Sequence, residues 1–223
     1  MAGAMLQGWI AGGVAPSRFT VADPANRPVP EGVRKLDALP ADGAFDAILL
    51  GIKPQLLPGV APQVEPLAGP GTTVISILAG VELAVLAELF PRAGGLLRVM
   101  PNLAAALGKS PMALASRGLD EEAQAAALEF LGPLGTPEWI AEEEFDLVTA
   151  LAGSGPAFVY RFIDALGAAA SELGLPEAQA KRLALAMVDG AAALAATSPH
   201  DPGELARRVA SPGGTTQAGL DAL

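Results

Sequence analysis

The chain has 223 residues, of which 51% are hydrophobic and 17% are charged, so it holds enough apolar material for a sizeable core and is not a disordered chain. Its 14 basic and 24 acidic residues give a net charge of -10, which argues against a basic groove for nucleic acid. The sequence has no cysteine, and His200 is its one histidine, which excludes disulfides, thiol catalysis and Cys- or His-rich metal sites. We therefore expect neither a metal site nor a nucleic-acid partner.

The mean hydropathy of +0.41 is high enough that a membrane location has to be considered. A helix that spans a bilayer needs about 18 or more consecutive apolar residues. The longest charge-free stretches, residues 1–17 and 66–81, are interrupted by glycine, proline and polar residues. The N-terminus also lacks the basic region of a signal peptide. We therefore expect a soluble cytoplasmic protein that does not bind membranes.

Short apolar runs alternate with helical patterns over the first two thirds of the chain. Strands are predicted over residues 18–22, 46–52, 72–78 and 96–100, and helices over residues 2–11, 82–90 and 121–131. Runs that are apolar on both faces are typical of parallel strands covered by helices on both sides. The alternation predicts an α/β fold with a doubly wound sheet.

One segment of this half fits the pattern less well. Pro54, Pro58, Pro62 and Pro66 recur at every fourth residue, where the sheet needs a crossover helix. Interior prolines break helices. We expect either a short helix or an irregular crossover here.

The pattern changes near residue 142, beyond which no strand is predicted. Helices are expected over residues 142–152, 156–173, 176–197, 204–210 and 216–223. The sequence therefore predicts two domains, an α/β domain over residues 1–142 and an all-helical domain over residues 143–223.

Three segments end the predicted parallel strands in a similar way. They are GIKPQ at 51–55, SILAG at 76–80 and RVMPN at 98–102. Ligands of such sheets bind at the carboxyl ends of the strands. Asp23 closes an earlier strand, where a dinucleotide fold places an acid against the adenine ribose; a plain Asp-Pro turn explains it equally well.

Two further segments place glycines and a proline directly before a helix. They are GSGPA at 153–157 and SPGGTT at 211–216. Glycines let a ligand approach the backbone, and a helix N-terminus offers free N–H groups to a carboxylate. Either segment taken alone is more typical of a loop with a helix cap.

Taken together, RVMPN, GIKPQ, ALAGSGPAFVY and VASPGGTTQAGL resemble the pyrroline-5-carboxylate reductase family in their order and spacing, over essentially the whole chain. The resemblance implies a Rossmann-like domain that binds NADPH or NADH, followed by an all-helical dimerisation domain. It also implies a homo-oligomer built on dimers, with the active site at the dimer interface between the domains. The implied reaction is the reduction of 1-pyrroline-5-carboxylate to L-proline, the last step of proline biosynthesis.

The resemblance also implies roles for individual residues. Backbone N–H groups around Gly213, Gly214 and Thr215 would bind the substrate carboxylate, and Ser154 would join the substrate site. Thr216 would be the catalytic residue, because its hydroxyl would hydrogen-bond the ring nitrogen and orient the imine. The residues expected at the cofactor are Met1, Asp23, Ile52, Lys53, Pro54, Ala79, Gly80, Pro101 and Asn102.

Two departures from the family pattern keep other functions open. The family begins with a strand and a glycine-rich turn that ends in Asn-Met. Met1 matches that Met, so the first strand and its phosphate-binding glycines are expected to be missing. The family also continues beyond Leu223. Weak cofactor binding is the consequence. A non-catalytic dimerising or ligand-binding remnant and a related imine or hydroxyacid reductase are the alternatives. The cofactor preference also stays open, because Asp23 favours NADH whereas Asn26 and Arg27 favour NADPH.

Overall fold

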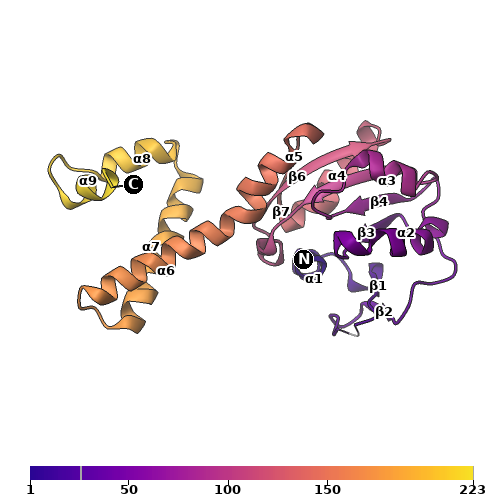
Figure 1. Ribbon diagram of the computed structural model, residues 1–223, viewed down its shortest axis with the longest axis horizontal. Coiled ribbons are helices and arrows are strands. Elements are labelled where there is room, and N and C mark those ends of the chain that lie inside the picture. The colour runs from indigo at the N-terminus through magenta and orange to yellow at the C-terminus, as the bar shows by residue number, and fades with distance from the viewer. Residues whose placement is uncertain (26, 223) are drawn as a thin grey trace. The chain divides into compact units, whose positions relative to one another are not determined.

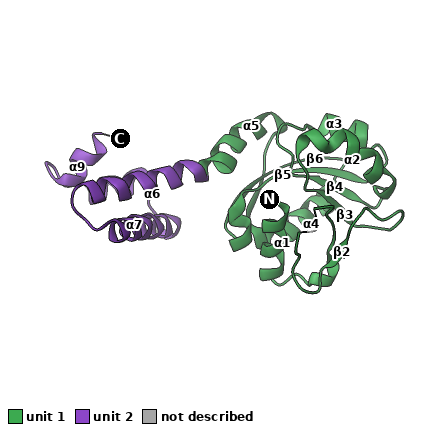
Figure 2. Cartoon of the chain, turned by 60° about the horizontal axis from the view of Figure 1, so that its bottom comes forward, with its two compact units in different colours: residues 1–155 green, residues 156–223 purple. Residues whose placement is uncertain are grey.

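A computed structural model describes residues 1–25 and 27–222, so Asn26 and Leu223 lie outside the described residues. The chain divides into two compact units, residues 1–155 and 156–223, which are described separately below (Figure 2). The division falls after Gly155, whereas the sequence places a domain boundary near residue 142.

The described residues of the first unit form seven strands, shown in Figure 1. Their bounds are β1 Thr20–Ala22, β2 Arg34–Leu36, β3 Ala47–Leu50, β4 Thr73–Ser76, β5 Gly95–Met100, β6 Ser110–Arg117 and β7 Gly135–Trp139. β1 and β2 form a parallel pair, and β3 to β7 form a five-stranded sheet in sequence order. In the described part of the chain β1 pairs only with β2, and β3 only with β4 on one side. A strand lying between β1 and β3 would find unpaired backbone groups on both.

The strand directions differ from the all-parallel sheet that the sequence predicts. β3, β4 and β5 are parallel, but β6 is antiparallel to β5, and β7 is again parallel to β6. Only residues 101–109 connect β5 to β6, and a parallel crossover needs a dozen residues or more. The short connection therefore makes the chain turn back beside β5.

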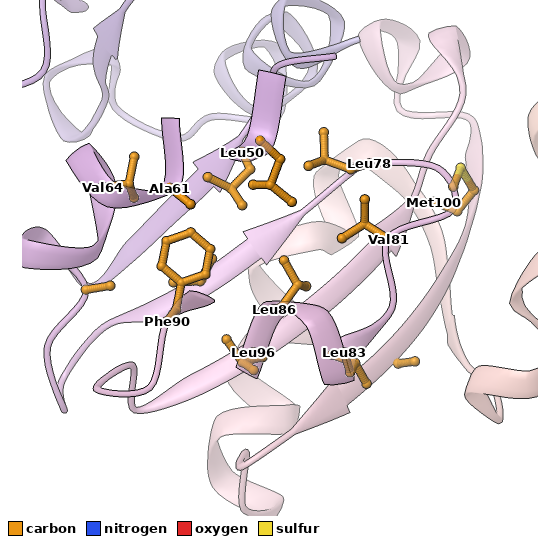
Figure 3. Packing of buried hydrophobic residues seen from close by; sticks show 14 of the residues in the cluster. Leu50, Ala61, Val64, Leu78, Val81, Leu83, Leu86, Phe90, Leu96 and Met100 are labelled. Atoms are coloured by element: carbon orange, nitrogen blue, oxygen red, sulfur yellow. The ribbon is translucent and has the colours of Figure 1, made fainter. Parts of the chain in front are cut away.

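Helices cover both faces of the five-stranded sheet. Their bounds are α1 Ala2–Ala11, α2 Leu57–Val64, α3 Leu83–Leu89, α4 Glu121–Leu131 and α5 Phe145–Val148. Successive strand residues point to opposite faces, so Val74 and Leu96 pack with α2 and α3, while Ile75 and Leu97 pack with α1 and the end of α4. Figure 3 shows the first of these two cores, with Phe90 and Leu86 over the sheet. The predicted doubly wound α/β architecture is confirmed.

The proline-rich crossover forms a short helix, α2, with irregular turns at both ends, as expected from its prolines. α2 contains Pro62 and is flanked by 3-10 turns over Pro54–Leu56 and Glu65–Leu67. Proline removes one N–H donor per residue, so 3-10 turns at both ends divide the crossover into short pieces. Leu57, Ala61 and Val64 still share its buried face.

The second unit is helical, as predicted. Its helices are α6 Gly155–Glu172, α7 Glu177–Thr197, α8 Pro202–Val209 and α9 Thr215–Leu220. α6 and α7 leave many large apolar side chains exposed, among them Phe158, Val159, Tyr160, Phe162, Leu183, Leu185, Met187 and Leu194. None of the helices in the described residues is both long enough and apolar enough to span a membrane.

Candidate active site

The candidate site begins with three loops at one edge of the five-stranded sheet. Because β3, β4 and β5 are parallel neighbours, their carboxyl ends share that edge. The residues predicted from the resemblance follow these ends as Ile52, Lys53 and Pro54, as Ala79 and Gly80, and as Pro101 and Asn102. Lys53, Ala79 and Gly80 are exposed, whereas Pro101 and Asn102 are buried. The structure thus brings three of the predicted segments together.

The N-terminus of α1 reaches the same edge. A Cβ atom placed on Gly51, at the end of β3, would lie 2.7 Å from the Cβ atom of Ala2. Met1 is the N-cap of α1, and its carbonyl accepts the N–H groups of Ala4 and Met5 at 2.9 and 3.2 Å. The first N–H groups of a helix have no partner within it and suit an anion. Met1 therefore lies beside the loop that follows β3.

Asp23 lies at the carboxyl end of β1 and closes a turn. Its Oδ1 accepts the N–H of Ala25 at 3.0 Å, and its Oδ2 pairs with Arg27 Nε at 2.9 Å. The Ala25 hydrogen bond first, and the Arg27 charge second, hold the pKa of the Asp23 carboxyl below its usual value. Asp23 is thus a charged turn residue, and its contact with a ribose stays a prediction.

Asn102 connects the end of β5 to the segment that carries the GSGPA motif. Its Nδ2 donates to the carbonyl of Ala152 at 2.9 Å, and its Oδ1 accepts the N–H of Ala104 at 2.9 Å. The amide is therefore engaged inside the protein at both of its ends. This places Asn102 beneath the site as a link between β5 and the motif.

The motif itself begins in a π-helix over Thr149–Ser154 rather than in the α-helix that the sequence predicts for residues 142–152. A Cβ atom on Gly153 would lie 3.9 Å from the Met100 sulfur, so the motif borders the end of β5. Ser154 is exposed next to it. Short π-helices in proteins are frequent at functional sites, where their wider turn displaces backbone groups.

Sequence reasoning gave no role to Arg98, which lies in β5 with a side chain only 3% exposed. Its Nη1 binds Glu142 Oε1 at 2.7 Å, and its guanidinium carbon lies 4.0 Å from the centre of the Phe145 ring. Among the described residues its Nε has no hydrogen-bond partner. An arginine inside the apolar run LLRVM was the signal that could have identified it.

The SPGGTT segment lies in the second unit. Gly213 has a φ of +70°, a left-handed conformation that favours glycine, and Gly214 is the N-cap of α9. Thr215 and Thr216 are the first two residues of that helix, and both are exposed. The meeting of these residues with the loops of the first unit stays a prediction.

The loops of the first unit fit a nicotinamide dinucleotide. Gly80 has a φ of +72°, and no atom lies within 4 Å of the place where its Cβ would stand, so a flat ring has room to approach the backbone. Three strand ends and a helix N-terminus converge there, as cofactor binding in open α/β sheets requires. Among residues 1–25 and 27–222 no group of three or more potential ligand side chains could hold a metal ion.

Comparison with known proteins shows which proteins this chain is similar to. Residues 142–223 match the family described as pyrroline-5-carboxylate reductase dimerisation. The chain is 40% identical to the pyrroline-5-carboxylate reductase of Aquifex aeolicus over 80% of its own length and 66% of that protein, which is just under two thirds. It is 34% identical to pyrroline-5-carboxylate reductase 3 of Danio rerio over 100% of its length and 80% of that protein. The crystal structure of Plasmodium falciparum pyrroline carboxylate reductase with NADP bound superposes with a TM-score of 0.86, at 23% identity, over 99% of this chain and 84% of that one.

Proposed function

The chain belongs to the pyrroline-5-carboxylate reductase family, and we propose that it reduces 1-pyrroline-5-carboxylate to L-proline with NADPH or NADH. One observation carries the proposal: GIKPQ, SILAG, RVMPN and the start of GSGPA come together at the carboxyl ends of the parallel strands β3, β4 and β5. Residues 142–223, which match the dimerisation family, give a second and independent observation in its favour. The relatives are named as pyrroline-5-carboxylate reductases, and these names support the choice of pyrroline-5-carboxylate as the substrate proposed for this chain.

The reaction needs little from side chains. NADPH or NADH, held by the segments at the strand ends, would supply the hydride for the imine carbon and would become NADP⁺ or NAD⁺. The C=N bond of the protonated imine would become a C–N single bond, and the nitrogen would keep its proton. The protein has to hold the two carbons close together and exclude water. A site made of backbone N–H groups, glycines and hydroxyls suffices for this task, and this is the composition of the segments described above.

We propose the following roles for the residues of the site. Gly80 and Ala79, with Pro101, provide the surface against which the nicotinamide ring lies, and Ile52, Lys53 and Pro54 lie on the adenosine side. In the second unit, the N–H groups of Gly213, Gly214 and Thr215 bind the carboxylate, with Ser154 added from the π-helix. Thr216 hydrogen-bonds the ring nitrogen, and its hydroxyl can be either the donor or the acceptor of this bond. The family resemblance supports each of these roles.

The match of residues 142–223 to a dimerisation family supports a homo-oligomer. We propose a dimer as its unit, because α6 and α7 expose an apolar face that a partner would cover. A cytoplasmic location is part of the same proposal.

The test is an assay of NADPH and NADH oxidation with pyrroline-5-carboxylate, with identification of proline as the product. 1-Pyrroline, which lacks the carboxylate, is the control substrate. Fast turnover of pyrroline-5-carboxylate and slow turnover of 1-pyrroline would support the proposal. Equal rates with both would indicate a general imine reductase, and binding of neither cofactor in a fluorescence titration would indicate a non-catalytic protein.

A further inference from the structure

An ion pair between a buried arginine and a half-buried glutamate joins the sheet to the chain just after β7. Arg98 points from the middle of β5 into the core that α2 and α3 cover, where its side chain is 3% exposed. Glu142 follows β7 and is half-buried. Burying an arginine in an apolar core is unfavourable unless it is paired, and an apolar pair of similar volume would often be at least as stable. The pair therefore calls for an explanation other than stability.

The carboxylate of Glu142 serves two partners with one oxygen. Its Oε1 accepts both from Arg98 Nη1 and from the backbone N–H of Leu83, each at 2.7 Å. Leu83 is the first residue of α3, whose own N-cap residue, Glu82, makes no side-chain cap bond. Glu142 thus caps α3 from a distant part of the chain, and fixes the end of the loop that contains Ala79 and Gly80.

Arg98 also contacts the first residue of α5, the helix that leads into the π-helix. Its guanidinium lies over the ring of Phe145, which is 1% exposed and begins α5. The Phe145 carbonyl accepts the hydroxyl of Thr149 at 2.7 Å, at the point where α5 becomes the π-helix of residues 149–154. The same guanidinium therefore contacts the groups that fix two different parts of the site.

We propose that Arg98 and Glu142 are positioning residues, which set the Ala79–Gly80 loop against the π-helix so that cofactor and substrate meet in register. The inference rests on the proposed reductase function. In the proposed mechanism neither side chain touches the reacting atoms. A displacement of about 1 Å between reacting groups lowers a rate by about a hundredfold, so a pair that fixes two loops is expected to act on the hydride step.

The test separates positioning from stability by means of a double variant. Glu142→Leu leaves the buried guanidinium of Arg98 without its carboxylate, and Arg98→Met leaves Glu142 with only the N–H of Leu83 as a partner, so each is expected to lower the unfolding temperature. Combined, they replace the ion pair by an apolar pair, and the unfolding temperature returns toward that of the wild type. We expect single-turnover hydride transfer to remain about tenfold to a hundredfold slow in the double variant, with the KM for the imine changed less than about threefold. Glu142→Gln, which keeps an oxygen for Leu83, should lose less than Glu142→Leu.

A second readout needs no cofactor. Amide hydrogen exchange over residues 78–83 is expected to speed up in Glu142→Leu and in the double variant. The control pair is Arg92 and Glu65, which are joined at 2.6 Å near the far end of α3, with the Arg92 side chain 56% exposed. Arg92→Met is expected to change neither the exchange at residues 78–83 nor the hydride step.

Each outcome decides one of the two proposals. A double variant that regains the wild-type hydride rate along with its stability would show that the pair is only structural. Unchanged exchange over residues 78–83 in Glu142→Leu, or equal losses in Arg92→Met, would overturn the inference whatever the activity. A wild-type chain that binds cofactor and does not reduce pyrroline-5-carboxylate would instead overturn the proposed function.

Discussion

The hydroxyl of Thr216 is the side-chain group that the proposed reaction depends on most. It lies on an exposed second residue of α9. We expect Thr216→Ala to lower turnover of pyrroline-5-carboxylate by about tenfold to a hundredfold, because one hydrogen bond of about 1–3 kcal/mol to the imine is lost. Steady-state kinetics and a fluorescence titration check this, with NADPH affinity unchanged. Thr197→Ala removes a hydroxyl at the end of α7 and is the matched control; wild-type turnover in Thr216→Ala would remove this residue from the mechanism.

The pair formed by Asp23 and Arg27 bears on the choice of cofactor. Asp23, whose pKa is lowered, is charged at neutral pH and repels a 2′-phosphate, whereas the exposed Arg27 attracts one. We expect Arg27→Ala to lower the affinity for NADPH relative to NADH by about three- to tenfold, and Asp23→Ser to raise it, because contacts of exposed charges are weak. Parallel titrations with both cofactors measure the ratio. Arg18→Ala, before the other end of β1, is expected to leave the ratio unchanged; an equal shift there would reduce the effect to net charge.

At the scale of elements, α1 approaches the backbone of another segment closely at Gly8. A Cβ atom on Gly8 would lie 2.0 Å from the carbonyl oxygen of Ala105 and 2.8 Å from Leu134 Cδ2. We expect Gly8→Ala to lower the free energy of unfolding by about 1–3 kcal/mol, because α1 has to move away from the short helix that follows β5. Denaturant unfolding measures it.

Gly3 in the same helix provides the control, because no atom lies within 4 Å of its Cβ position. Gly3→Ala should raise stability by about 0.5–1 kcal/mol through helix propensity alone. Equal effects of the two substitutions would contradict the packing that the structure shows for α1.

At the scale of the whole molecule, the apolar face of α6 and α7 predicts self-association. Phe158 is 68% exposed and Tyr160 is 64% exposed, and patches of this kind mark interfaces. We expect the wild-type chain to sediment as a dimer or a larger oligomer, and Phe158→Lys to shift it toward the monomer. Leu56→Lys, which changes an exposed apolar residue of the first unit, should not do so. A monomeric wild type at micromolar concentration would contradict the proposal.

The two sheets of the first unit make a further prediction at this scale. β1 and β3 each have an unpaired edge in the described residues, and parallel pairs of two short strands are marginal alone. A longer chain, extended ahead of Met1 by a segment that pairs with both edges, is expected to unfold at a higher temperature and to bind NADPH more tightly. Thermal unfolding and titration of both forms check this, and equal values would show that neither edge receives a strand.

The sequence by itself determined the fold class and most of the elements. Short runs that are apolar on both faces and helical faces with period 3.6 are local patterns. β3, β4, β5, α1, α3, α4 and the helices of the second unit could therefore be predicted from neighbouring residues. The motifs at the strand ends followed in the same way, because a parallel sheet places the carboxyl ends of its strands at one edge.

The tertiary structure alone decided what depends on residues far apart in the chain. β2 and β7 carry polar, glycine and proline residues, and they are strands because a neighbouring strand pairs with them; the direction of β6 follows from a short connection. Arg98 and Glu142 lie 44 residues apart, and Asn102 and Ala152 lie 50 apart, so no local pattern connects them. Their pairing arises because a buried charge or amide has to find a partner within the packed interior, and only the folded chain determines which group lies within reach.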